Sequence, residues 1–141
     1  MDALADSADP NLTSMPDIEA ETSSRLIDSY AVVRAQSVAL IDGLSDADCT
    51  VQSMPDASPA KWHLAHTTWF FEEVVLCGAL AQSDRFDPKF QYLFNSYYDA
   101  VGARHARPER GLLTRPSLDT VLEYRDHVDA RMKSTLPDIM A

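Results

Sequence analysis

Residues 58–80 constrain the fold of this chain more than any other stretch. They begin SPAKWHLAHTTWFFEE and keep a helical pattern to about Leu80. Ser58 can cap a helix and Pro59 suits its first position, so the pattern predicts a helix over residues 59–80. A helix that is apolar on two sides lies at the centre of its domain or contacts a second domain. The apolar side chains form a main stripe and a patch on the back of the helix: Trp62, Trp69 and Leu76, then Leu64, Phe71 and Val75.

Residues 23–43 and 117–135 predict two further helices. In the first, apolar side chains share one broad face, and Gly43 can end the helix. The second lies between Pro116 and Pro137 and repeats the pattern. Since no stretch favours a sheet, the chain is expected to be all-α, an up-down helical bundle.

Two charged residues fall inside the apolar face of the helix predicted over 117–135. Arg125 and Asp129 are four residues apart, which is the spacing of a helical ion pair. We expect them to satisfy each other or to orient a polar group of a neighbouring helix. His127 points to the opposite side, so it is not considered a ligand.

His66 and Glu73 lie in the middle of the main apolar stripe of residues 59–80. With Trp62 at 0°, His66 lies at about 40° and Glu73 at about 20° on the helix. Burying either side chain without a partner would cost a few kcal/mol. Two interpretations remain open: His66 is a metal ligand, or it is a core histidine satisfied by a backbone carbonyl or by Glu73.

A long segment, residues 82–116, separates the second and third predicted helices. Its aromatic residues argue against disorder, and its length favours a functional loop or one with short elements of its own. Four of the chain's 12 basic residues lie close together in it: Arg104, Arg107, Arg110 and Arg115. This basic cluster is a candidate anion site. The alternative is a loop whose arginines pair with nearby acids such as Glu109.

Composition excludes several classes of protein. The net charge of −10 argues against a nucleic-acid partner, because phosphates would be repelled. No apolar run approaches the length of a membrane span, and the N-terminus lacks the features of a signal peptide, so a cytoplasmic protein is expected. Cys49 and Cys77 are expected to be free thiols there. The acidic residues 1–22 predict a disordered leader, which leaves residues 23–141 as the folded domain.

Two long motifs resemble a known family. SPAKWHLAHTTWFFEE and FQYLFNSYYDAVGARHARPERGLLTRPSLDTVLEYRDHVDARM, in this order, are similar to the N-terminal DinB-like domain of the ergothioneine-biosynthesis sulfoxide synthases (hercynine oxygenases). The resemblance covers about residues 20–135 and implies a fold of the four-helix-bundle type. Related ovothiol and selenoneine enzymes share this domain type and remain alternatives.

The resemblance implies a mononuclear non-haem iron(II) enzyme that uses O2. Such an enzyme joins a thiol compound, γ-glutamylcysteine or cysteine, to the imidazole C2 of hercynine and forms a sulfoxide. Three histidines hold the iron: His66 matches the first, and an H-x-x-x-H pair on a later helix supplies the others. Arg107 and Arg110, with Arg104 as a further candidate, match arginines that bind the thiol substrate's carboxylate. Glu73 is a candidate second-shell partner of His66.

The sequence departs from this family pattern at its end. It stops at MKSTLPDIMA, before the helix that should carry the H-x-x-x-H pair. We therefore expect a bundle without its fourth helix, no tightly bound Fe(II) in this chain alone, no catalytic residue and no activity in isolation. His105 lies in the arginine segment and does not replace the missing ligands.

Two hypotheses follow from the sequence. In the first, the chain is the N-terminal domain of an ergothioneine-type sulfoxide synthase and contributes His66 and the arginines. In the second, it is a stand-alone, non-catalytic helical module. Such a module would bind another protein, or form a homodimer, through the groove that the missing helix leaves exposed.

Overall fold

The structure, a computed structural model, describes residues 15–140. Its long helices are α1 (Met15–Ala39), α3 (Ala60–Phe70) and α5 (Leu118–Met140), and α3 continues directly into a π-helix, η1 (Phe71–Ala79). The short helices are α2 (Asp46–Thr50), α4 (Phe90–Leu93) and the 3-10 helix η2 (Arg107–Leu112). Within the described residues the only strand-like pairing is one isolated bridge, so the all-α prediction is confirmed. Every helix in this part of the chain is too short or too polar to cross a membrane.

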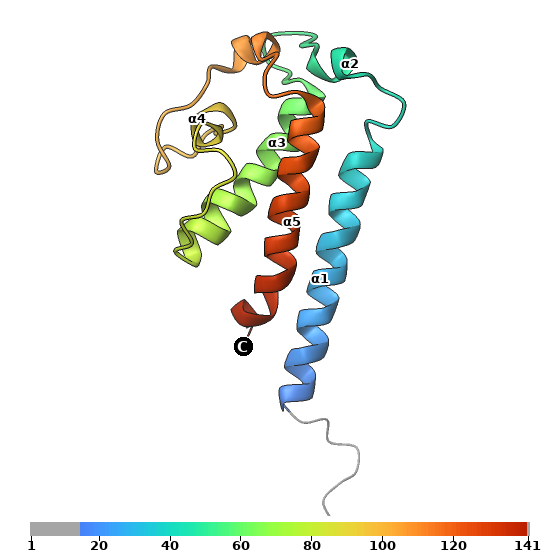
Figure 1. Ribbon diagram of the computed structural model, residues 1–141, viewed down its shortest axis with the longest axis vertical. Helices are drawn as coiled ribbons and strands as arrows, with labels where there is room; N and C mark the ends of the chain where they lie inside the picture. The colour runs from blue at the N-terminus through green and yellow to red at the C-terminus, as the bar shows by residue number, and fades with distance from the viewer. Residues whose placement is uncertain (1–14, 141) are drawn as a thin grey trace, which may run out of the picture.

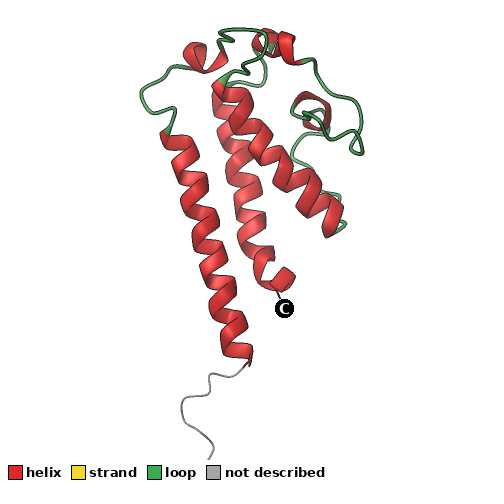
Figure 2. Cartoon of the chain, turned by 180° about the vertical axis from the view of Figure 1, so that it is seen from behind, coloured by secondary structure: helices red, strands yellow, loops and turns green. Residues whose placement is uncertain are grey.

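The long helices lie side by side, with α5 packed against both α1 and α3 (Figure 1). The chain runs up α1 and down α3 and η1, and then runs down again in α5. Two consecutive long helices can share a direction only if the chain returns between them. Residues 80–117, drawn mostly as loop in Figure 2, make this return along the side of α3.

The core lies where α3, η1 and α5 meet. Trp69 and Leu76 are fully buried against Tyr124 and Val128 of α5, and burying each such side chain contributes about 2 kcal/mol. The returning segment joins this core through Phe90 and Phe94, which are 3% and 2% exposed, together with Phe86 and Leu93. The segment is therefore ordered and contains short elements of its own, α4 and η2, as its aromatic residues and its length indicate.

The first helix begins earlier than the sequence indicates. Residues 15–22, predicted as part of the leader, form the first turns of α1, where Glu21 and Arg25 make an i,i+4 ion pair of 2.6 Å. The leader remains a prediction for residues 1–14, which lie outside the described residues. At its other end α1 closes through a turn to Gly43, whose φ of +78° suits glycine.

The boundaries of the other two long helices also differ in detail. Pro59 is the N-cap of α3, and no side chain caps this helix, so the predicted role of Ser58 is wrong. The Ser58 hydroxyl instead accepts a hydrogen bond from Arg110. The third helix continues to Met140 with Pro137 inside it, beyond the predicted end at residue 135.

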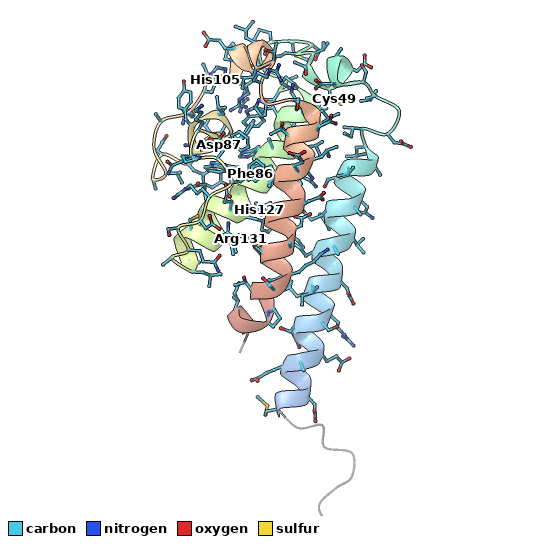
Figure 3. The ribbon with its side chains drawn as sticks, in the orientation of Figure 1. Cys49, Phe86, Asp87, His105, His127 and Arg131 are labelled. Carbon is cyan, nitrogen blue, oxygen red and sulfur yellow. The ribbon has the colours of Figure 1, made fainter. Side chains whose placement is uncertain are left out.

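Two adjacent carboxylates in η1 attach the returning segment to the bundle. Glu72 is 1% exposed and accepts hydrogen bonds from the Tyr124 hydroxyl at 2.6 Å and the Phe86 amide at 2.9 Å. Figure 3 shows Phe86 on the same side of α5 as His127 and Arg131, and the Phe86 and His127 rings lie 5.5 Å apart. Glu73, the next residue of η1, binds Arg85 of the returning segment. The wide π-helical turn allows both consecutive carboxylates to reach partners on this side of the helix.

A buried polar network joins α1, α3 and α5. Asp129 does not pair with Arg125; its Oδ1 accepts hydrogen bonds from Arg34 Nε at 2.7 Å and from the Tyr30 hydroxyl at 2.6 Å. Arg125 donates instead to the Leu64 carbonyl and to α3 hydroxyls. The second of the two expectations for this pair therefore holds: each residue orients groups of a neighbouring helix.

Candidate functional site

His66 lies in a stack of aromatic rings on α3. Its imidazole is nearly parallel to the Trp62 indole, with centroids 4.7 Å apart, and to the Trp69 indole, with centroids 5.6 Å apart. Tyr98 of the returning segment lies at 6.4 Å. The spacing of Trp62, His66 and Trp69 along one helical face is the reason for the stack. The rings fix the plane of the imidazole.

One hydrogen bond fixes which nitrogen of His66 carries the proton. Nδ1 lies 2.7 Å from the Phe94 carbonyl oxygen, which can only accept, so Nδ1 donates. No described residue hydrogen-bonds to Nε2, whose lone pair is available. Burial lowers the pKa of His66, and Arg110 and His63 lower it further, whereas the Phe94 carbonyl acts in the opposite direction. The ring is therefore neutral at physiological pH, the state in which histidine binds metals.

Trp62 connects His66 to the arginine cluster. The guanidinium carbon of Arg110, on η2, lies 3.5 Å from the centre of the Trp62 ring. Its Nη1 donates to Ser58 at 2.8 Å, and the residue is only 3% exposed. Burial, with Arg107 and Arg104 nearby, lowers the pKa of Arg110 to about 10, and Tyr97 opposes this shift. Arg110 thus places a positive charge close to the imidazole.

Arg104 and Arg107 are farther from His66 and share one aromatic partner. Both guanidiniums lie over the exposed ring of Tyr97, at 5.0 and 4.9 Å from its centre. Arg104 also pairs with Asp99 at 2.9 Å. No described residue accepts a hydrogen bond from the Arg107 guanidinium, so its donors are free to bind a ligand. Of the three predicted arginines, Arg107 has the most unused donors.

Glu73 does not contact the His66 stack through any hydrogen bond among the described residues. Its carboxylate accepts two hydrogen bonds from Arg85, at 2.6 and 3.0 Å, and one from Gln91 at 3.4 Å. The Phe94 carbonyl, not Glu73, is the partner of His66. That Glu73 supports His66 at a metal site stays a prediction.

His63 packs edge-on against Trp62, with centroids 5.6 Å apart, whereas His105 and His127 have their contacts elsewhere. His105 contacts Tyr92 and, through Nε2, the Glu109 carbonyl at 3.1 Å. His127 packs on Phe86, and its Nε2 is buried without a partner. Within the part of the chain that the structure describes, no three His, Cys, Asp or Glu residues converge to form a metal site.

Sequence reasoning missed the residues that link His66 to the arginines. Trp62 was identified as core, although it contacts both His66 and Arg110. Its spacing of four residues from His66 is the signal that could have revealed the stack. The parts played by Phe94 and Ser58 had no such signal, because both contacts join residues far apart in sequence.

Comparison with known proteins identifies one family. The model of the DinB superfamily matches residues 29–141, which is most of the chain. Among the curated proteins, none matches the chain.

Proposed function

The chain belongs to the DinB superfamily, and on that premise we propose that it is the N-terminal domain of an ergothioneine-type sulfoxide synthase. In this proposal it contributes one ligand to a non-haem iron(II) centre and a set of arginines to the thiol substrate. One observation carries the proposal. The Phe94 carbonyl holds His66 Nδ1–H and leaves Nε2 unprotonated beside the arginine cluster.

The arrangement around His66 fits one ligand of a metal centre. Metal-binding histidines commonly donate their second ring N–H to a carbonyl or carboxylate, which fixes the ring and its tautomer. Two further ligands are needed, and we propose that an H-x-x-x-H pair outside residues 15–140 supplies them. Iron(II), when bound, supplies the activation of O2. His66 holds its place through Trp62, Trp69 and the Phe94 carbonyl.

The arginines would hold and orient the thiol substrate, γ-glutamylcysteine or cysteine, while hercynine provides the imidazole. Arg107 has unused donors, and a guanidinium binds a carboxylate with two parallel hydrogen bonds. Arg110 is fixed by Trp62 and Ser58 and would contribute mainly charge. Arg104 would have to leave Asp99 to take part. We therefore rank Arg107 first among the substrate residues.

Calorimetric Fe(II) titration under anaerobic conditions tests the metal proposal. The chain alone should bind Fe(II) no better than a lone surface histidine. Extending it with a family-type helix that carries an H-x-x-x-H pair should create a stoichiometric site. In that extended protein His66→Ala should abolish binding, while His127→Ala, the matched control, should leave it nearly unchanged. Tight binding by the unmodified monomer, or binding that survives His66→Ala, would contradict the proposal.

The substrate proposal has its own test in the extended, metal-loaded protein. Titration with γ-glutamylcysteine should shift the guanidinium NMR signals of Arg107 and Arg110. Arg107→Lys should weaken binding, because an ammonium cannot copy the planar fork of arginine. Arg115→Lys is the control within the same basic cluster. Unchanged Arg107 and Arg110 signals would rule out their assignment.

A non-catalytic interaction module is the second candidate function, and one feature of α1 favours it. Leu26 and Val33 lie seven residues apart on α1, and Leu40 follows directly after the helix at the same spacing; the three are 41%, 59% and 83% exposed. Apolar side chains at this spacing form a stripe along one face of a helix, which is typical of a helix that binds a partner. A second copy of the chain, or another protein, would cover this stripe.

Sedimentation of the purified chain tests this candidate. A homodimer should dissociate when Val33→Glu places a charge in the stripe, whereas Val51→Glu, at an exposed position outside α1, should have no effect. A chain that stays monomeric at all concentrations would exclude the homodimer. It would leave another protein as the partner for this second function.

A further inference from the structure

One face of α1 carries a regular stripe along the whole length of the helix. Figure 1 shows α1 at the edge of the layer of long helices, next to α5. The stripe has five apolar side chains, between 41% and 83% exposed, and three residues with hydroxyl groups. All of them lie within about 60° of Val33 on a helical wheel. In chain order they are Met15, Ile18, Thr22, Leu26, Ser29, Val33, Ser37 and Leu40.

Two of the hydroxyl residues are already satisfied inside α1. The Thr22 hydroxyl donates to the Ile18 carbonyl at 2.8 Å, and the Ser37 hydroxyl donates to the Val33 carbonyl at 2.8 Å. A second protein surface can therefore cover these two side chains without leaving their hydroxyl donors unpaired, which would otherwise cost free energy. The stripe is thus suited to burial despite its polar members.

The spacing of the stripe is the same when it is read from either end. The intervals between its members are 3, 4, 4, 3, 4, 4 and 3 residues. The 3-4-4 pattern repeats every 11 residues, or about 3.67 residues per turn, so two nearly straight helices can stay in contact along it. Because the spacing is palindromic, the stripe matches a second copy of itself that runs in the opposite direction. A two-fold axis produces such a contact, in which both copies use the same surface.

The charges of α1 favour this direction over a parallel pairing. Its acidic residues all lie in the first half of the helix, at Asp17, Glu19, Glu21 and Asp28. From residue 29 to residue 39 the only charged side chain is Arg34, which is 5% exposed. Parallel helices would bring the two acidic halves together, whereas antiparallel helices place each acidic half beside an uncharged half.

We propose that α1 pairs with α1 of a second copy in an antiparallel contact in which Val33 is level with the partner's Thr22. This pairing is a specific form of the homodimer offered as the second candidate function, so it rests on that proposal and not on the metal or substrate site. Large side chains then oppose small ones at most levels, as close packing requires. The remaining levels pair Met15 with the partner's Leu40, Ile18 with the partner's Ser37, and Leu26 with the partner's Ser29.

Crosslinking of the full chain tests the direction and the register. Cys77→Ser removes the partly exposed native thiol, and Cys49 is fully buried. In this background, Thr22→Cys and Val33→Cys proteins are prepared separately, mixed, and treated with a short bismaleimide. The mixed 22–33 product should dominate over either self-product. Identical residues of the two copies would lie 11 residues apart along the helices, about 16 Å, which is beyond the reach of a short reagent.

A pair of charge variants tests the same register without a crosslink. Gln36, which is exposed, would lie level with the partner's Glu19. Gln36→Lys should therefore lower the dissociation constant of the dimer several-fold at low salt, and Gln36→Glu should raise it. Ser24→Lys and Ser24→Glu make the same charge changes on the opposite side of α1 and are the matched controls. A contact of one helix per copy is small, so we expect a concentration-dependent dimer, and sedimentation is the measurement.

The outcomes separate this pairing from the homodimer in general. Self-products of Val33→Cys or Thr22→Cys without the mixed product would overturn the antiparallel register, although a homodimer would remain. A dimer in sedimentation that gives no 22–33 product would place the contact on another surface. Equal dissociation constants for the two Gln36 variants would also contradict the register. A chain that stays monomeric at every concentration would overturn the homodimer together with this pairing.

Discussion

The two halves of the second long helix treat their buried polar groups differently. His66 of α3, and Arg110 of η2 on the other face of the same indole, are held mainly by the Trp62 ring, each with one hydrogen bond, and both keep unused nitrogen atoms. In η1, Glu72 and Glu73 lie within a few residues of His66 and use their oxygens fully on Tyr124, Arg85 and the backbone of Phe86. The polar groups at Trp62 therefore keep unused hydrogen-bond donors or acceptors, whereas the carboxylates of η1 keep almost none.

This difference separates a site from a structural anchor better than residue type does. A buried group whose partners are all protein atoms has a fixed environment and holds two segments together. A buried group with an unused lone pair or donor can take a ligand without breaking an existing bond. Sequence reasoning placed His66 and Glu73 in one site because both lie on one stripe, and among the described residues they share no hydrogen-bond partner.

The largest loss of stability is expected at Glu72, whose two carboxylate oxygens both accept hydrogen bonds from buried groups. Glu72→Ala leaves the buried Tyr124 hydroxyl and the Phe86 amide without an acceptor, and each such loss costs about 1–3 kcal/mol. We expect the free energy of unfolding to fall by about 3 kcal/mol, measured by urea denaturation. Glu123→Ala, at an exposed position on α5, is the control. A loss of stability no greater than that of the control would show that Glu72 does not anchor the returning segment.

A smaller loss is expected from Arg85→Ala, which leaves Glu73 with only Gln91 at 3.4 Å. The Glu73 side chain is 3% exposed, so its carboxylate would be buried and nearly unpaired, at a cost of about 2 kcal/mol. Adding Glu73→Gln to Arg85→Ala removes the buried charge and should recover part of the loss. A double-mutant cycle measures this coupling. Additive effects would show that the pair contributes nothing as a pair.

The all-α fold was predictable because its long helices have clear apolar periodicity. The helices expected over 59–80 and 117–135 correspond to α3 with η1 and to α5. The start of α1 was missed because residues 15–22 are rich in acids and lack a continuous apolar stripe. The local apolar pattern identifies a helix, but the ends of the helix depend on capping hydrogen bonds. Ser58 does not cap α3, because its hydroxyl accepts a hydrogen bond from Arg110, which is distant in sequence.

The candidate site was predictable in part. The position of His66 follows from an α-helical wheel, and so does its stacking on Trp62. The same wheel fails after Phe70, because η1 turns with i→i+5 hydrogen bonds and rotates less per residue. Glu72 therefore becomes a core residue that no period of 3.6 could indicate. Contacts between distant segments, such as His66 with Phe94 and Arg110 with Ser58, carry no sequence signal.

At the contact between η2 and Trp62 of α3, Arg110→Lys should have a moderate effect on stability. Lysine keeps the charge but loses the planar contact with Trp62 and the geometry of the bond to Ser58. We expect a loss of about 1 kcal/mol in urea denaturation, the typical size of one hydrogen bond or one cation–π contact. Arg104→Lys, at an exposed arginine of the same segment, is the control. If the two variants behave alike, the stack on Trp62 contributes no stability.

The smallest effect concerns the protonation of His66. Burial lowers its pKa in the folded state below the ordinary value of 6.5, and the charges of Arg110 and His63 add to this. The unfolded chain therefore takes up a proton more readily than the folded chain. Stability should be complete above about pH 6.5 and should decline as the pH falls from there toward the folded pKa. His66→Gln should flatten this decline, in urea denaturation measured across that range, while His105→Gln is the matched control.

NMR should show Nδ1 of His66 protonated and Nε2 without a proton throughout the neutral range, as the hydrogen bond to the Phe94 carbonyl requires. An Nε2–H tautomer would contradict this comparison. His66 would then have no free lone pair at Nε2, and it would no longer differ from the η1 carboxylates, whose oxygens are all hydrogen-bonded.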